Sequence, residues 1–98
     1  MAYKVLFTED ALADLEGILD YIRADDEVAA EAFGLALLNH VELLQSFPHI
    51  GTPVPKRANV RKILHSPIRV YYRLHERKGL IEILHFWHGA RRSPTLKG

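Results

Sequence analysis

The sequence predicts an α+β fold with the element order β-α-α-β-β-β, in which an antiparallel sheet packs on a helical hairpin. Three observations support this prediction. The first half of the chain has two segments with apolar residues at helical spacing, and the second half has three segments that suit strands. A segment rich in proline and glycine separates the halves. Because 98 residues is the length of one domain, we expect 1–98 to form a single domain.

The first half begins with a short strand, which we expect over Tyr3–Phe7. Thr8 is a suitable N-cap for the helix that follows, and acidic residues in its first turn favour the helix dipole. The helical stripe comprises Ala11, Leu12, Leu15, Ile18, Leu19 and Ile22. Asp14 is expected to lie largely off this stripe. The pattern breaks after Ile22, and either Asp25 or Asp26 is expected to cap a second helix.

The second helix is expected to end near Phe47, because Pro48 cannot continue it. Its main apolar stripe, which should meet the sheet, consists of Phe33, Leu37, Val41 and Leu44. Further leucines lie beside that stripe, namely Leu35, Leu38 and Leu43. These leucines either cover the first helix or await a partner. With so few residues between them, the two helices should form an αα-hairpin.

Residues 48–55 form a rigid, irregular connector, and three strands are predicted after it. We expect these strands over Val60–His65, Ile68–His75 and Leu80–His88. Residues 76–79 join the last two strands as a hairpin, with Gly79 supplying a positive φ. No internal repeat interrupts this order.

Alternation along the strands assigns residues to two faces of the sheet. On the inner face, toward the helices, we expect a buried set of Ile68, Val70, Tyr72, Leu74, Ile81 and Ile83, with His85 and Trp87 on the same side. On the outer face we expect Arg69, Tyr71, Arg73, His75, Glu82, Leu84, Phe86 and His88. In this register His88 lies opposite Arg69, and Arg69, Arg73 and His88 are exposed without partners.

Charge is distributed unevenly between the halves. Residues 1–47 carry two bases and ten acids, whereas residues 48–98 carry eleven bases and two acids. A cationic outer face with interleaved aromatic rings suits phosphates and unpaired bases. The bases expected to contact a target are Lys56, Arg57, Lys62, Arg73, Arg91 and Arg92. The alternatives are that acidic helices merely neutralise a basic sheet, or that the charged face only prevents aggregation.

The sequence gives no indication of a metal or cofactor site, a membrane span or a leader. There is no cysteine, and His85 and His88 should point to opposite faces of one strand, so we expect no metal ligands. His85 is interpreted as a hydrogen-bonded core histidine. Glycine-rich phosphate loops and nucleophile elbows are absent from the sequence. Because no long apolar run or signal sequence is present, we expect a cytoplasmic protein.

Motifs along nearly the whole chain resemble the RelE/ParE superfamily of toxins, which includes plasmid-stabilisation proteins. These motifs are Thr8–Leu15, Tyr21-Ile22, Phe47–Pro53, Arg69–Arg73 and Ile81–Arg92. The resemblance implies the fold given above, with the first strand beside the last in an antiparallel sheet. It also implies a cognate antitoxin that neutralises the toxin. RelE-like members cut messenger RNA on the ribosome without a metal, whereas ParE-like members inhibit DNA gyrase.

The resemblance carries three residues over as catalytic, but only for an RNase: Arg69 and Arg61 toward phosphate, and His88 as acid or base. The chain departs from RNase members, because residues 52–56 contain no glutamate and no tyrosine follows the last strand. We therefore predict a ParE-like gyrase inhibitor, with a RelE-like endoribonuclease and a non-toxic binding module as alternatives. The antitoxin is expected on Leu35 and Leu38 or on the cationic outer face.

Overall fold

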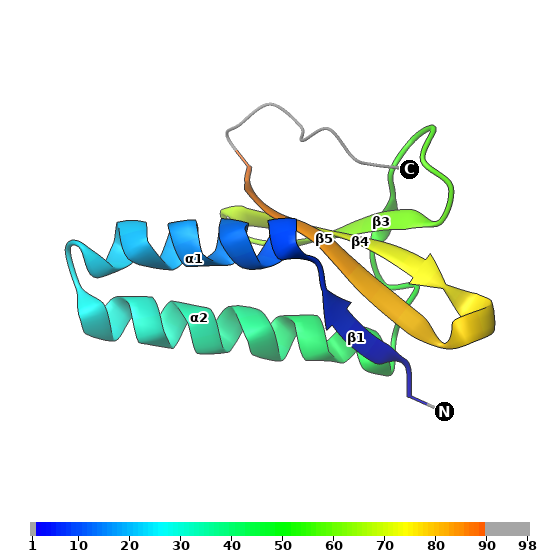
Figure 1. Ribbon diagram of the computed structural model, residues 1–98, viewed down its shortest axis with the longest axis horizontal. Coiled ribbons are helices and arrows are strands. Elements are labelled where there is room, and N and C mark those ends of the chain that lie inside the picture. Colours follow the sequence, from blue (N-terminus) through cyan, green and yellow to red (C-terminus); the bar gives the residue numbers. More distant parts are fainter. Residues whose placement is uncertain (1, 90–98) are drawn as a thin grey trace.

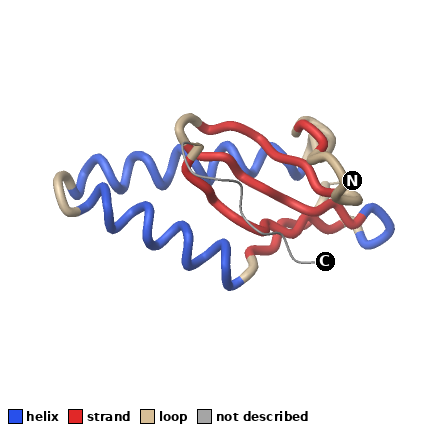
Figure 2. The backbone as a smooth tube through the Cα atoms, turned by 90° about the horizontal axis from the view of Figure 1, so that it is seen from above, coloured by secondary structure: helices blue, strands red, loops and turns tan. Residues whose placement is uncertain are grey.

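The computed structural model describes residues 2–89 and has two layers, a helical hairpin and a five-stranded sheet (Figures 1 and 2). The helices are α1 (Glu9–Arg23) and α2 (Glu27–Glu42), followed by the 3-10 turn η1 (Leu43–Gln45). The strands are β1 (Lys4–Phe7), β2 (Thr52–Pro53), β3 (Val60–His65), β4 (Ile68–His75) and β5 (Leu80–His88), with the 3-10 turn η2 (Glu76–Lys78) between β4 and β5. The turn between the helices projects beyond the sheet (Figure 1).

Side-chain caps fix the start of both helices. The Thr8 hydroxyl accepts a hydrogen bond from the Ala11 amide, as its N-cap position predicts. Asp26, rather than Asp25, caps α2 by accepting from the Ala29 amide. Within the described residues, neither helix is long and apolar enough to cross a membrane.

The sheet has the strand order β1-β5-β4-β3-β2, which confirms that the first strand lies beside the last. The expected antiparallel pairing of β1 is wrong, because β1 runs parallel to β5 and the sheet is mixed. The long helical connection after β1 permits a parallel arrangement that a tight hairpin would forbid. The connector also forms the short strand β2, whose Thr52 pairs with Lys62 of β3.

The core lies between the inner face of the sheet and the helices, as predicted. The inner-face residues Ile68, Val70, Tyr72, Ile81 and Ile83 are each at most 2% exposed. Leu37 and Val41 of α2 and Leu44 of η1 are buried against them, and Phe33 of α2 is partly buried at the margin. Strand alternation therefore predicts this half of the core correctly.

A β-bulge in β5 changes the second half of that strand. Tyr72 pairs with Ile83, but its neighbour Tyr71 pairs with His85, so Leu84 is an extra residue in the ladder. Beyond the bulge the alternation is reversed. Phe86 is buried in the main core and stacks on Phe7, with ring centroids 6.2 Å apart.

This reversal corrects four predicted positions. His85 and Trp87 lie opposite Tyr71 and Arg69, and therefore belong to the outer face. Phe86 belongs to the inner face. His88 lies opposite Ile68 rather than Arg69, because one inserted residue moves every following side chain to the other face. His88 remains exposed, as expected.

The outer face has a small apolar cluster of its own. Val60 and Tyr71 are 1% and 2% exposed, and Leu84 packs with them. Val54 from the connector and Trp87 are partly buried against this cluster. Tyr71 lies on the predicted face, but it is buried and offers no ring for stacking on a base.

Candidate functional site

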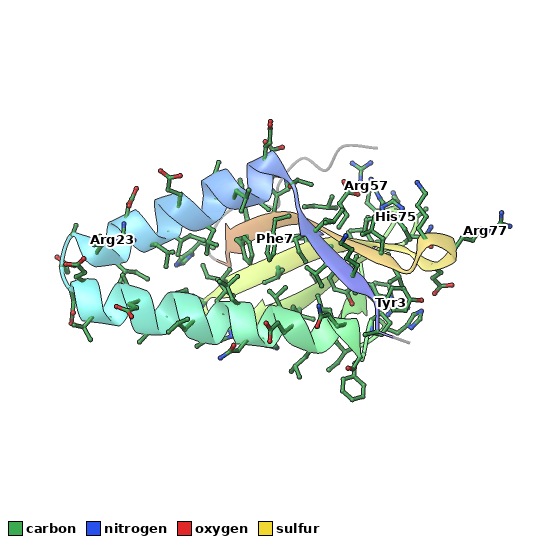
Figure 3. The ribbon with its side chains drawn as sticks, turned by 60° about the horizontal axis from the view of Figure 1, so that its bottom comes forward. Tyr3, Phe7, Arg23, Arg57, His75 and Arg77 are labelled. Atoms are coloured by element: carbon green, nitrogen blue, oxygen red, sulfur yellow. The ribbon has the colours of Figure 1, made fainter. Side chains whose placement is uncertain are left out.

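Two of the bases expected to contact a target, Lys62 and Arg73, lie on the outer face of the sheet. Lys62, Arg69 and Arg73 extend from β3 and β4 and are partly buried. Lys56 and Arg57 are exposed on the connector, and Figure 3 shows Arg57 at the end of the molecule away from Arg23. Arg73 and His88 both have interaction partners, so the expectation that they would have none is wrong. Arg91 and Arg92 lie outside the described residues.

Arg61 belongs to the inner face and holds the connector. It lies opposite Tyr72, and its Nη1 donates to the carbonyl oxygens of Gly51 (2.7 Å) and His49 (3.2 Å). The Tyr72 hydroxyl donates to the Pro48 carbonyl (2.7 Å) and accepts from the Gly51 amide (3.1 Å). Burial raises the pKa of Tyr72, although the Gly51 bond and Arg61 oppose that rise. The hydroxyl therefore stays protonated and can donate to the connector.

The three residues proposed for RNA cleavage do not converge. Arg69 lies opposite Leu64 and Trp87 on the outer face, whereas His88 lies opposite Ile68 at the end of β5. Arg61 is on the other face from Arg69. It lies three positions from Leu64, which is about 10 Å along the strand. The strand register therefore distributes these three residues over both faces of the sheet rather than around one point.

An Asp14–His85 pair is the polar cluster that sequence reasoning missed. Asp14 Oδ2 lies 2.8 Å from His85 Nδ1 and accepts from the Phe86 amide at 3.2 Å. Both side chains are mostly buried, with exposed fractions of 22% for Asp14 and 14% for His85. The placement of Asp14 off the helical stripe is thus wrong. Asp14 lies three residues after Ala11 and four before Ile18, which both belong to the stripe, and this spacing indicates that Asp14 lies on the same face of the helix.

His85 also borders a hollow of about 260 Å³ on the outer side of α1. The hollow is lined by Thr8, Glu9, Asp10, Arg73, Glu82, Leu84 and His85. Three carboxylates surround one guanidinium, so the hollow is unsuited to a phosphate. In the described part of the chain, no group of three or more histidine, aspartate or glutamate residues could hold a metal ion.

A pair of histidine side chains, His40 and His65, lies on the inner side of the sheet. His40 Nδ1 of α2 is 2.8 Å from His65 Nδ1 of β3, and the His65 ring meets Phe33 edge-on. Burial, followed by repulsion from His40, lowers the pKa of His65. The contact requires one ring to donate and the other to accept, which is possible only while at least one histidine is neutral.

The extra leucines of α2 form an exposed apolar stripe. Leu35 is 58% exposed and Leu38 36%, so they do not cover α1. The helices instead approach through Gly34, whose missing Cβ would lie 3.3 Å from Leu19. Leu43, Phe47 and Ile50 continue the exposed apolar surface beyond α2. The structure therefore excludes the alternative that Leu35 and Leu38 cover α1, and it leaves both side chains exposed.

Comparisons with known proteins agree with this architecture. A family model described as the ParE toxin of the type II toxin–antitoxin system, parDE, matches residues 5–93. The chromosomal ParDE system of P. aeruginosa contains a similar structure, with a TM-score of 0.73 and 24% identity over 89% of this chain and 96% of that one. No curated protein matches this sequence.

RelE-type structures are similar as well. The RelBE2 toxin–antitoxin complex of Mycobacterium tuberculosis matches with a TM-score of 0.62 and 23% identity, over 90% of this chain and 99% of that one. A mutant RelE toxin of E. coli in the free state matches with a TM-score of 0.64 and 20% identity, over 92% of this chain and 86% of that one. At these identities the likeness concerns the fold.

Proposed function

Since this chain belongs to the ParE toxin family of type II toxin–antitoxin systems, we propose that it arrests growth by binding DNA gyrase in the cytoplasm rather than by cleaving RNA. The observation that carries the proposal is the separation of Arg61, Arg69 and His88. Metal-independent RNA cleavage needs a base, an acid and charge stabilisation around one phosphate. Here Arg61 is bonded to the connector, and Arg69 and His88 belong to opposite faces.

The outer face is the surface that we assign to the target. Lys62 lies on this face, Arg73 borders its hollow, Lys56 and Arg57 lie on the connector, and Arg91 and Arg92 follow β5 in the sequence. A concentration of bases accelerates encounter with an acidic surface and orients the complex. Binding of this kind needs no proton transfer, and it is compatible with a face that lacks a catalytic set.

Two assays on purified components separate gyrase inhibition from RNA cleavage. We expect the protein to inhibit DNA supercoiling by gyrase and to leave ribosome-bound message intact. His88→Ala should keep its potency, whereas Arg91→Ala combined with Arg92→Ala should weaken it. An RNase would instead lose about a hundredfold or more in rate with His88→Ala or Arg69→Ala. Cleavage of ribosome-bound message by the wild type would contradict the proposal, and no growth arrest would indicate a non-toxic binding module.

We further propose that a cognate antitoxin covers the exposed stripe of α2 around Leu35 and Leu38. Exposed apolar residues at helical spacing offer a surface on which the apolar face of an amphipathic helix can pack. Acidic residues flank the stripe, including Glu31 and Glu42, so the antitoxin helix should carry bases beside its apolar face.

The antitoxin surface can be tested with a matched pair of substitutions. Leu35→Asp combined with Leu38→Asp should abolish co-purification with the antitoxin while the toxin still folds. The control is Leu64→Asp, because Leu64 is 62% exposed but lies on the outer face. If Leu64→Asp disrupts the complex and the α2 variant does not, the antitoxin occupies the outer face instead.

A further inference from the structure

The bulge in β5 is held by side chains from the start of the chain. The Thr8 hydroxyl lies 2.9 Å from the Ile83 carbonyl oxygen and 3.2 Å from that of Leu84, and donates to this pair. Asp14 accepts from the Phe86 amide and pairs with His85. Contacts from one end of α1 thus reach four consecutive residues of β5, at sequence separations of 71 to 76 residues.

These contacts satisfy groups that a bulge disturbs. An inserted residue interrupts the ladder, and a buried amide or carbonyl without a partner is destabilising. One carboxylate oxygen of Asp14 contacts both the Phe86 amide and the His85 ring, and hydrogen bonds to a carboxylate are of the stronger, charge-assisted type. Loss of the Asp14 carboxylate should therefore favour the regular ladder.

The bulge decides which aromatic ring the outer face presents. In the observed register Trp87 lies beside Arg69 on the outer face, and Phe86 is buried in the core. In an unbulged ladder the two rings would exchange faces. Tryptophan and arginine are the residues that most often dominate the binding energy of protein interfaces. Tyr71 is buried, whereas Trp87 is only partly buried against the outer cluster, so part of its ring is open to a partner.

We propose that Asp14 is a positioning residue that holds the bulge and thereby presents Trp87, with Arg69, to an acidic protein surface bound on the outer face. The inference rests on the proposed function insofar as it places a protein target on that face. Asp14 does not contact the target itself. It acts by fixing the register of β5, and this register decides which side chains the outer face presents.

The single tryptophan of the chain provides a direct readout. Asp14→Ala should move Trp87 toward the core, which shifts its fluorescence to shorter wavelength and protects it from iodide. Exchange of the Phe86 amide should accelerate in the same variant. In cells, the expression level needed for growth arrest should rise by about tenfold or more, as for loss of one anchor residue.

Two variants separate positioning from a general loss of stability. Asp14→Asn keeps one side-chain oxygen, which in the place of Oδ2 can accept from both the Phe86 amide and the His85 ring, so it should restore all three readouts. Glu16→Ala removes an exposed carboxylate from the same helix and should change none of them. Circular dichroism reports whether each variant folds. If Asp14→Ala does not fold, Trp87→Ala decides, and full growth arrest by that variant would overturn the proposal.

The remaining outcomes are also decisive. Wild-type fluorescence and exchange in folded Asp14→Ala would show that Asp14 does not hold the register. A shifted Trp87 with undiminished growth arrest would show that the presented ring is not the contact. The expected changes in Trp87 fluorescence, Phe86 amide exchange and growth arrest do not depend on whether the target is gyrase or the ribosome. A wild type that arrests no growth would instead contradict the proposed function, while the spectroscopic comparison would still test the register.

Discussion

The two faces of the sheet differ in how they are determined. On the inner face, alternating apolar residues of β4 and β5 are buried against α2, and the helices cover them. On the outer face, the bulge at Leu84 brings Trp87 and His85 to a surface where alternation predicted Phe86 and His88. Local pattern therefore specifies the inner face up to the bulge, whereas distant contacts from Thr8 and Asp14 specify both faces of β5 beyond it.

This difference separates stability from recognition in the molecule. The inner face contains the large buried side chains, and it also anchors the connector through Arg61 and Tyr72. The outer face has only a small apolar cluster around Tyr71, with bases around it. Substitutions on the inner face should mainly change the free energy of unfolding, and those on the outer face should mainly change binding.

The largest expected effect tests this separation directly. Ile83→Ala removes a fully buried side chain from the inner face and should lower the free energy of unfolding by about 2–5 kcal/mol, measured by urea denaturation. Its matched control is Leu64→Ala on the outer face, which is 62% exposed and should change that free energy by less than about 0.5 kcal/mol. Equal losses from both substitutions would contradict the division between the faces.

The next effect concerns the connector where it meets the inner face. A Cβ on Gly51 would lie 2.6 Å from the Tyr72 hydroxyl oxygen and 2.8 Å from the Lys62 carbonyl oxygen. Gly51→Ala should therefore lower the free energy of unfolding by about 1–3 kcal/mol through overpacking. Gly17→Ala is the control, since nothing lies within 4 Å of its added Cβ. A stable Gly51→Ala variant would mean that the connector can move away from the sheet.

A smaller effect is expected when only the Tyr72 hydroxyl is removed. Tyr72→Phe keeps the ring in the core but leaves the Pro48 carbonyl and the Gly51 amide without their partner. We expect a loss of about 1–2 kcal/mol in the free energy of unfolding. Faster amide exchange at Gly51, with unchanged exchange in β5, would locate the effect in the connector. Faster exchange throughout the sheet would instead mean that the Tyr72 hydroxyl stabilises the whole core.

Particular residues show how far the sequence predicts this structure. The bounds of β3, β4 and β5 follow from alternation and turn residues, and Gly79 adopts the expected positive φ of 59°. The N-cap of α1 follows from the preference of Thr8. The bulge does not follow, because it depends on hydrogen bonds to Asp14 across 71 and 72 residues. The family resemblance predicts Arg61 as a phosphate ligand, but its partners are backbone carbonyls of a folded connector.

The smallest expected effect is a pH dependence that arises at the inner face. The pKa of His65 lies below its ordinary value of 6.5 in the fold, so the unfolded chain binds more protons between the two pKa values. This contribution to stability is present above pH 6.5 and is lost as the pH falls toward the folded pKa. Urea denaturation of the wild type and His65→Gln, from about pH 5 to about pH 7.5, measures the difference. His65→Gln should flatten the loss at low pH, whereas His49→Gln, at an exposed histidine, should retain the part due to His65. Parallel pH profiles for the wild type and His65→Gln would contradict a lowered pKa of His65 in the fold.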